Sequence, residues 1–161
     1  MIVIINGAPG TGKTKTAEEL NSKIPQSALI DGDCLLAINP RNNSDEERSL
    51  RYKLIAEVAK IYYQHGYLTI FIAFVYPGPS SLSEQIQLLS NFDQVKVVSL
   101  ITDNEELRRR HQSDNYKRGG IENSIRLNDQ IKKLTETELI DNTHLSLEQV
   151  AEEIIKYFSF R

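Results

Sequence analysis

Short apolar runs recur along the chain and are separated by longer stretches in which apolar residues repeat at helical spacing. The apolar runs predict strands at residues 2–5, 27–30, 68–75, 95–101 and 138–140. Near-continuous apolar runs are typical of strands that are covered on both faces. Because these strands alternate with helical stretches, the pattern predicts an α/β fold, a three-layer arrangement with a parallel sheet between helices.

Polar residues at fixed spacing indicate where the helices begin. A capping residue stands three positions before an acid or an amide in four pairs, which are Ser44 with Glu47, Ser81 with Glu84, Asp103 with Glu106, and Ser146 with Gln149. In such a pair each side chain can bind a backbone N–H group at the start of the helix. The pairs therefore predict four helix starts, and a further helix is expected over residues 14–22.

Composition narrows the class of protein. The length of 161 residues indicates a single domain, 1–161, and the net charge of −3 favours neither nucleic acid nor an anionic membrane as a partner. No apolar run is long enough for a membrane span or a signal peptide. The single cysteine, Cys34, fits a reducing compartment and is expected to be a small buried residue, so a cytoplasmic protein is expected. The three histidines lack metal-ligand spacing and are expected at surface or capping positions, and they are His65, His111 and His144.

The segment after the first apolar run is Gly7-Ala8-Pro9-Gly10-Thr11-Gly12-Lys13-Thr14, a complete G-x-x-x-x-G-K-[ST] phosphate loop. Its glycines let backbone N–H groups turn toward a phosphate, and the following helix N-terminus adds partial positive charge. Lys13 is expected to reach the β- and γ-phosphates, and Thr14 to bind Mg²⁺. The candidate ATP-binding residues are Gly7, Ala8, Pro9, Gly10, Thr11, Gly12, Lys13, Thr14, Lys15, Arg108 and Asn142. The alternative is a glycine turn that binds no nucleotide.

Two acids end the second apolar run, in Asp31-Gly32-Asp33. Ligands of parallel α/β sheets bind beyond the carboxyl ends of the strands, so both acids are expected on the same edge as the phosphate loop. We assign Asp31 to Mg²⁺ and Asp33 to the phosphate acceptor, where it either takes the hydroxyl proton or hydrogen-bonds the substrate. The alternative is that one acid only forms a turn, because Asp-Gly is a strong turn pair.

A basic segment, Arg108-Arg109-Arg110, follows the fourth apolar run and predicts a mobile lid at about residues 104–120. Arginines of a closing lid can neutralise charge on the γ-phosphate. Neighbouring helical residues point about 100° apart, so at most two of the three can face the nucleotide. We select Arg109 as the catalytic arginine and Arg108 as a nucleotide contact. The sequence does not decide which arginine of the lid meets the γ-phosphate. A charged surface helix is the alternative.

Together these motifs resemble the small P-loop kinases, which include shikimate kinase, gluconate kinase, adenylylsulfate kinase and chloramphenicol phosphotransferase. The opening segment is also similar to tunicamycin-resistance-type proteins, and residues 139–143 are similar to the family's last strand and adenine-side loop, which contains Asn142. The resemblance implies a parallel five-stranded sheet of order 2-3-1-4-5, with ATP and Mg²⁺ as cofactors. It also implies that residues 10–14, Asp31, Asp33 and lid arginines form the site.

The acceptor side departs from this pattern. Residues 74–79 read Phe-Val-Tyr-Pro-Gly-Pro, where shikimate kinase has a glycine triplet. Arg41 could bind an anionic acceptor group or be a surface arginine. We therefore expect a kinase that transfers the γ-phosphate of ATP to a hydroxyl of an unidentified small molecule. The alternatives are an NTPase of the AAA type, which needs an acid after an apolar strand, and a nucleotide-binding protein without turnover.

Overall fold

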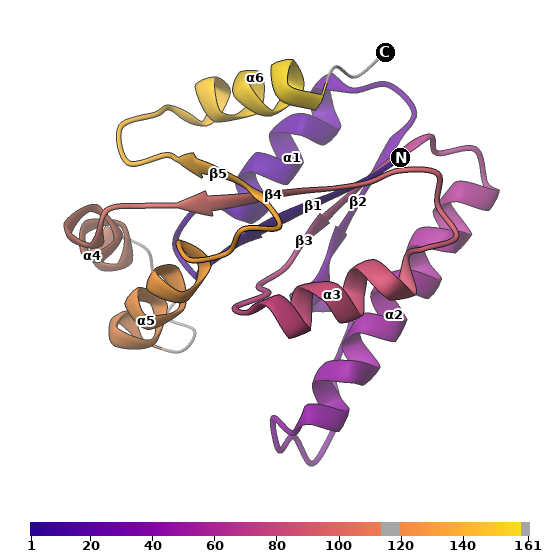
Figure 1. The fold of residues 1–161 in the computed structure, drawn as a ribbon, viewed down its shortest axis with the longest axis horizontal. Helices are drawn as coiled ribbons and strands as arrows, with labels where there is room; N and C mark the ends of the chain where they lie inside the picture. The colour runs from indigo at the N-terminus through magenta and orange to yellow at the C-terminus, as the bar shows by residue number, and fades with distance from the viewer. Residues whose placement is uncertain (114–119, 159–161) are drawn as a thin grey trace.

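Five parallel strands form one sheet in the order β2-β3-β1-β4-β5, as the sequence predicted (Figure 1). The computed structural model describes residues 1–113 and 120–158, apart from the side chain of Ser113. The strands are β1 (Ile2–Gly7), β2 (Ser27–Asp31), β3 (Thr69–Ala73), β4 (Val95–Ile101) and β5 (Glu138–Asp141). Since every strand pair is parallel, the carboxyl ends of all five strands meet at one edge of the sheet.

Helices cover both faces of this sheet (Figure 1). They are α1 (Lys13–Lys23), α2 (Asp45–Gln64), α3 (Pro79–Leu88), α4 (Asn104–Ser113), α5 (Ile121–Ile131) and α6 (Leu147–Phe158), with a 3₁₀ turn at Gly32–Cys34. Helices α1 and α6 pack on one face, α2, α3 and α5 pack on the other, and α4 follows the end of β4. The predicted lid corresponds to α4 and the segment leading to α5. Its C-terminal part, 114–119, lies outside the described residues, so the mobility of the lid stays a prediction.

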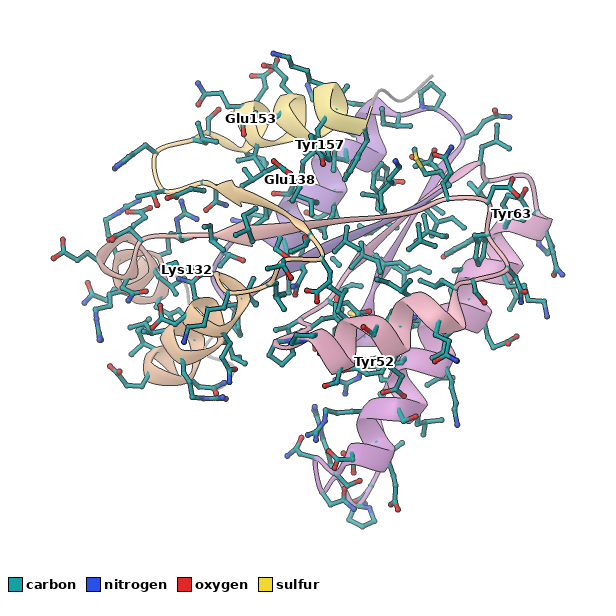
Figure 2. The ribbon with its side chains drawn as sticks, viewed as in Figure 1. Tyr52, Tyr63, Lys132, Glu138, Glu153 and Tyr157 are labelled. Atoms are coloured by element: carbon teal, nitrogen blue, oxygen red, sulfur yellow. The ribbon has the colours of Figure 1, made fainter. Side chains whose placement is uncertain are left out.

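The central strand β1 contributes to both layers of the core. Ile2 and Ile4 pack on the side of α2 and α3, whereas Val3 and Ile5 pack on the side of α1 and α6. All four are fully buried, as expected for alternating side chains of a covered strand. Side chains fill both layers, and at the β5 edge the side chains of Tyr157 on α6 and Glu138 lie near each other (Figure 2). None of the described helices is long and apolar enough to cross a membrane.

Three of the four predicted helix starts are confirmed. The side chains of Ser44, Asp103 and Ser146 accept hydrogen bonds from backbone N–H groups in the first turns of α2, α4 and α6. A reciprocal pair, in which the second residue also binds back, is complete for Ser146 with Gln149. In the other two confirmed pairs the glutamates bind elsewhere. Glu47 accepts from the backbone N–H groups of Asn42 and Asn43, and Glu106 accepts from two arginines of α4.

The predicted helix start at Ser81 is wrong. Helix α3 begins at Pro79 with Gly78 as its N-cap, and Ser81 Oγ accepts a hydrogen bond from the Gly78 N–H group. Proline suits the first helical position because no N–H group is needed there and its φ is already helical. The helix therefore starts two residues before the serine.

The buried amide of Asn6 joins the carboxyl ends of three strands. Its Oδ1 accepts hydrogen bonds from the backbone N–H groups of Gly7 and Tyr76, at 2.9 and 2.7 Å. Its Nδ2 donates to the Tyr76 carbonyl at 3.1 Å and to Ser99 Oγ at 3.0 Å. Since Tyr76 follows β3 and Ser99 lies on β4, this amide fixes the end of β1 between its two neighbours where the phosphate loop begins.

We predict that Asn6→Ala strongly destabilises the fold. The substitution leaves buried backbone groups of Gly7 and Tyr76 without partners, which should lower the free energy of unfolding by roughly 2–4 kcal/mol. Urea denaturation followed by circular dichroism measures this. The exposed Asn91→Ala variant is the control and should stay within about 0.5 kcal/mol of wild type. An Asn6→Ala variant as stable as this control would contradict the role of the amide.

Candidate active site

The phosphate loop leads from β1 into α1 through two glycines with left-handed backbone. The φ angles are 89° at Gly10 and 91° at Gly12, a region that residues with a Cβ atom rarely adopt. Gly12 is the N-cap of α1, and no side chain of the described residues caps this helix. The N–H groups of the first turn and the helix dipole are therefore available to an anion.

An open cavity of about 700 Å³ lies over this loop. Its walls include most of the predicted site residues, which are Pro9, Gly10, Thr11, Gly12, Lys13, Thr14, Lys15, Asp31, Asp33 and Asn142. Gly7 and Ala8 are buried beneath the loop. The remaining walls include Arg110 and His111 of α4 and the apolar side chains of Val75, Leu145, Leu147 and Val150. A volume of this size is typical of a site for a nucleotide-sized ligand.

Asp31 is held in place through both of its carboxylate oxygens. Oδ1 accepts a hydrogen bond from the Asp33 N–H group at 2.9 Å, and Oδ2 accepts one from Thr14 Oγ1 at 3.2 Å. The hydroxyl and the carboxylate that the sequence assigned to Mg²⁺ thus lie together. Oxygen ligands of this kind suit Mg²⁺, which is usually held by one or two protein groups and by substrate phosphates. The described residues contain no cluster of three or more His, Cys, Asp and Glu side chains that could hold a metal ion.

The ammonium group of Lys13 is buried at the start of α1. Burial lowers the pKa of Lys13, and the charges of Asp33 and Asp31 oppose that shift. Both acids therefore act electrostatically on the lysine of the phosphate loop. The structure brings these three predicted residues together on one side of the cavity.

Asp33 points to a region that the sequence left undefined. Its Oδ1 lies 3.9 Å from Nη1 of Arg51, a buried arginine of α2 whose guanidinium carbon is 5.2 Å from the centre of the Phe74 ring. A Cβ atom added to Gly32 would lie 2.7 Å from that ring, so only glycine fits between the two acids. Cys34, expected to be buried, is exposed and lines the cavity, because the 3₁₀ turn ends there at the surface.

Helix α4 presents Arg110 and His111 to the cavity. The imidazole of His111 packs against Gly10, since a Cβ atom there would lie 3.1 Å from its Cδ2, and its Nε2 is 3.0 Å from Ser124 Oγ on α5. Arg110 donates from Nη1 and Nη2 to the side-chain and backbone oxygens of Asn142, at 3.3 and 2.9 Å. His111, expected at a surface or capping position, is instead half-buried against Gly10 of the phosphate loop.

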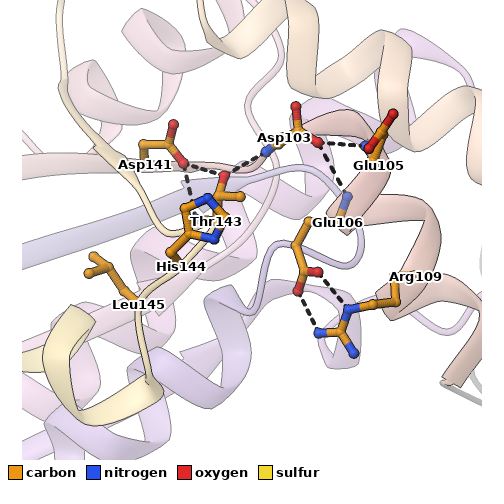
Figure 3. Close-up of a pocket in the computed structure, with 8 residues that line it drawn as sticks. All are labelled: Asp103, Glu105, Glu106, Arg109, Asp141, Thr143, His144 and Leu145. Atoms are coloured by element: carbon orange, nitrogen blue, oxygen red, sulfur yellow. Dashed lines mark hydrogen bonds and ion pairs between the residues drawn. The ribbon is translucent and has the colours of Figure 1, made fainter.

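Arg108 and Arg109 point away from this cavity. Arg108 forms an ion pair with Glu122 of α5 at 2.7 Å. Arg109 donates two hydrogen bonds to Glu106, at 2.6 and 2.7 Å, in a neighbouring acidic pocket of about 660 Å³ (Figure 3). Hydrogen bonds from Arg109 and Arg110 lower the pKa of Glu106 to about 2, so this carboxylate is ionised at neutral pH. The roles selected for Arg108 and Arg109 stay predictions, and the geometry favours Arg110.

Asn142 links the phosphate loop to the lid. Its Nδ2 donates to the Thr11 carbonyl at 2.7 Å, and its Oδ1 accepts from Thr102 Oγ1 at 2.7 Å as well as from Arg110. The side chain is buried where β4 and β5 end. Asn142, the residue predicted on the adenine side, thus holds the phosphate loop through the Thr11 carbonyl and orients Arg110 of α4.

The sheet order and the phosphate loop between β1 and α1 define a P-loop NTPase fold of the type found in small kinases. A family model described as an AAA domain matches residues 3–132, most of the chain. The chain therefore belongs to the AAA domain family. A comparison with curated proteins gives no match.

Solved structures with this fold include several kinases. The tunicamycin resistance protein of Deinococcus radiodurans is 17% identical, with a TM-score of 0.79 over 99% of this chain and 96% of that one. A sugar kinase of Janibacter sp. HTCC2649 is 16% identical, with a TM-score of 0.73 and coverage of 99% and 94%. An APS kinase of Mycobacterium tuberculosis, in complex with AMPPNP and APS, is 15% identical, with a TM-score of 0.74 and coverage of 98% and 96%. The predicted resemblance to small P-loop kinases is confirmed at the level of the fold.

We predict that Arg110, rather than Arg109, supports nucleotide binding. Arg110→Gln should weaken the affinity for Mg²⁺–AMPPNP about tenfold or more, because charge-assisted hydrogen bonds to phosphate are among the stronger ones. Arg109→Gln is the matched control and should change the affinity less than threefold, roughly 0.6 kcal/mol. Isothermal titration calorimetry measures both. A larger loss in Arg109→Gln would instead support the choice made from the sequence.

Proposed function

We propose that this protein is a kinase that transfers the γ-phosphate of ATP to a hydroxyl group of a small molecule. The observation that carries the proposal is that two neighbouring carboxylates of one cavity have different partners. Asp31 accepts a hydrogen bond from Thr14 of the phosphate loop, and Asp33 Oδ1 lies 3.9 Å from Nη1 of Arg51. Two acids in these positions serve a donor and an acceptor, whereas a simple ATPase needs no acceptor group.

The residues have separate tasks in this proposal. The phosphate loop and Lys13 bind the β- and γ-phosphates, and the apolar side chains near Asn142 contact the base. Thr14 and Asp31 would hold Mg²⁺, which neutralises charge on the phosphates when bound. Arg110 takes the place proposed for a lid arginine, because it lines the cavity. Each of these groups acts on the donor.

Asp33 acts on the acceptor. The acceptor oxygen forms a bond to the γ-phosphorus, the bond from that phosphorus to the β–γ bridging oxygen breaks, and ADP leaves. Asp33 accepts the hydroxyl proton or holds the hydroxyl in line. In a loose transition state the acceptor oxygen has formed little of its bond to phosphorus, so early removal of its proton accelerates the reaction little. Holding the acceptor hydroxyl in line with the γ-phosphate is therefore the larger contribution of Asp33 to the rate.

The AAA family description leaves an NTPase without acceptor as the second candidate. That class needs an acid at the end of a strand next to the phosphate loop, to hold the metal and position water. Strand β3, the neighbour of β1, ends at Ala73 and is followed by Phe74, Val75 and Tyr76. Asp103, the first acid after β4, caps α4 by accepting from the Glu105 and Glu106 N–H groups. These observations favour the kinase.

We predict that Lys13→Ala and Asp33→Asn each abolish phosphate transfer, with losses of about a hundredfold or more. Asp33→Asn should keep the AMPPNP affinity of wild type within about threefold, since Asp33 serves the acceptor. ADP release in the presence of pooled hydroxyl metabolites measures transfer, and calorimetry measures binding. Transfer close to wild type in Asp33→Asn would show that the assigned role is wrong.

The ADP-release assay also distinguishes the three candidate classes, which are a kinase, an NTPase and a nucleotide-binding protein without turnover. ADP release that requires an added acceptor supports the kinase. Fast hydrolysis without an acceptor supports the NTPase, and tight AMPPNP binding without turnover for any acceptor supports a binding protein. Glu57→Gln, an exposed acid on the outer face of α2, is the matched control and should leave transfer unchanged.

A further inference from the structure

Helix α2 has one long face that no other described element covers. The helix runs along the outside of the molecule, and its first turns project beyond the sheet (Figure 1). Its buried residues pack toward β2, β3 and α3. The opposite side carries a row of exposed residues, which we call the outer stripe, formed by Glu46, Leu50, Lys53, Glu57, Ile61 and Gln64. At about 100° per residue these positions lie within roughly 80° of one another around the helix axis.

Two large apolar side chains of the outer stripe are exposed to water. Leu50 is 43% exposed and Ile61 is 51% exposed. They lie at nearly the same angle around the helix and about three turns, roughly 16 Å, apart along it. A single exposed apolar residue is common on protein surfaces, so the meaning of these two depends on the residues between them.

Two opposite charges lie between the apolar residues. Lys53 and Glu57 are both exposed. Among the described residues, the ion pairs of α2 are formed by Arg48 and Arg51, so Lys53 and Glu57 have no ion-pair partner there. A lysine that precedes a glutamate by four positions is also the less favourable order for a pair within one helix. Both charges are therefore available to a second molecule.

The order of these four residues is self-complementary under a two-fold rotation. Two copies of α2, packed antiparallel about an axis at the middle of the helix, place Leu50 of one copy opposite Ile61 of the other. The same rotation places Lys53 of one copy opposite Glu57 of the other. At about 1.5 Å per residue, the axis positions that the two pairings require differ by less than about 1 Å along the helix. Each contact occurs twice, as in every isologous dimer.

We propose that the outer stripe of α2 is an interaction surface whose partner is a second copy of this chain, bound through antiparallel α2 helices. A second copy presents the complementary order of charged and apolar residues by symmetry, whereas any other partner would have to present it independently. One helix face is smaller than the about 800 Å² per partner of a standard interface, so the dimer is weak and forms with rising protein concentration. No residue of the outer stripe lines the nucleotide cavity, so the inference does not depend on the proposed kinase function.

The first test measures self-association by sedimentation equilibrium over a wide range of protein concentrations. Wild type should show a monomer–dimer equilibrium. Lys53→Glu and Glu57→Lys should each weaken it about tenfold or more, because each change places two like-charge pairs across the two-fold axis. Matched controls reverse exposed charges of α6, in Lys156→Glu and Glu153→Lys, and should associate as wild type does (Figure 2). A wild type that stays monomeric at every concentration overturns the inference, and so does a dimer that neither reversal on α2 weakens.

The second test mixes the two variants of α2. Each variant repels its own copies, but a chain with Lys53→Glu and a chain with Glu57→Lys bring opposite charges together at both contacts. The mixture should therefore form a heterodimer with an affinity within about threefold of the wild-type dimer. The single cysteine, Cys34, is exposed and lies outside the outer stripe, so a fluorophore attached to it in one variant reports association through its anisotropy.

Mixing distinguishes a lost contact from a damaged fold, because one misfolded variant cannot restore another. Circular dichroism first verifies that both variants are folded. The absence of a heterodimer between two folded variants overturns the antiparallel pairing. Neither measurement needs nucleotide or acceptor, so the result leaves the kinase proposal to its own assay.

Discussion

The structure depends on the meeting of parallel strand ends at one edge, where the backbone ladder stops and buried side-chain amides replace it. Beyond the last paired residues of β1 and β4, N–H and C=O groups still need partners, because an unpaired buried polar group is costly. Asn6 supplies them on the side of β3, and Asn128 pairs the N–H and C=O groups of Thr102 just beyond β4. Asn142, beyond β5, pairs the Thr11 carbonyl of the phosphate loop. The phosphate loop lies between Asn6 and Asn142, so its position is fixed by the same kind of bond that closes the sheet edge.

The two halves of the proposed site are held by different forces. On the donor side, hydrogen bonds hold Asp31 to Thr14 and to the next turn, and Gly32 leaves no room for adjustment against Phe74. On the acceptor side, Arg51 contacts Asp33 over a longer distance, and the preceding loop is exposed. A donor half with fixed side chains suits ATP, which is the same molecule in every reaction cycle. The side chains of the acceptor half are held by fewer bonds, so their final positions depend on the acceptor that binds.

Much of the fold and the donor half could be predicted from the sequence, because local pattern and sheet topology determine them. Apolar runs located all five strands, and the glycine and lysine spacing located the loop. The arginine that faces the cavity was harder to predict, because the spacing of three neighbouring arginines gives their relative directions but not which face of the helix packs inward. The position of Leu107 indicates that face. It is the apolar residue of α4 that is fully buried, and Arg110 and His111, three and four positions later, share its face.

Arg51 illustrates what sequence reasoning missed for a different reason. It lies one turn after Glu47 and one turn before Ile55, on the buried face of α2. A charged residue on the apolar face of a helix is a signal in itself, since such a residue is seldom buried without a partner. Which partner it has depends on residues brought close by the 3₁₀ turn after β2 and by the end of β3. Those contacts are non-local, so no spacing rule within α2 could supply them.

Glu106 separates the two arginines of α4 that the sequence could not rank. Its carboxylate accepts two hydrogen bonds from Arg109 and one from Arg110, and its low pKa keeps it charged at neutral pH. Arg109 lies at the neighbouring pocket, whereas Arg110 also donates two hydrogen bonds to Asn142 at the wall of the nucleotide cavity. The acid therefore neutralises Arg109 outside the cavity, and the buried Asn142 holds Arg110 at its wall.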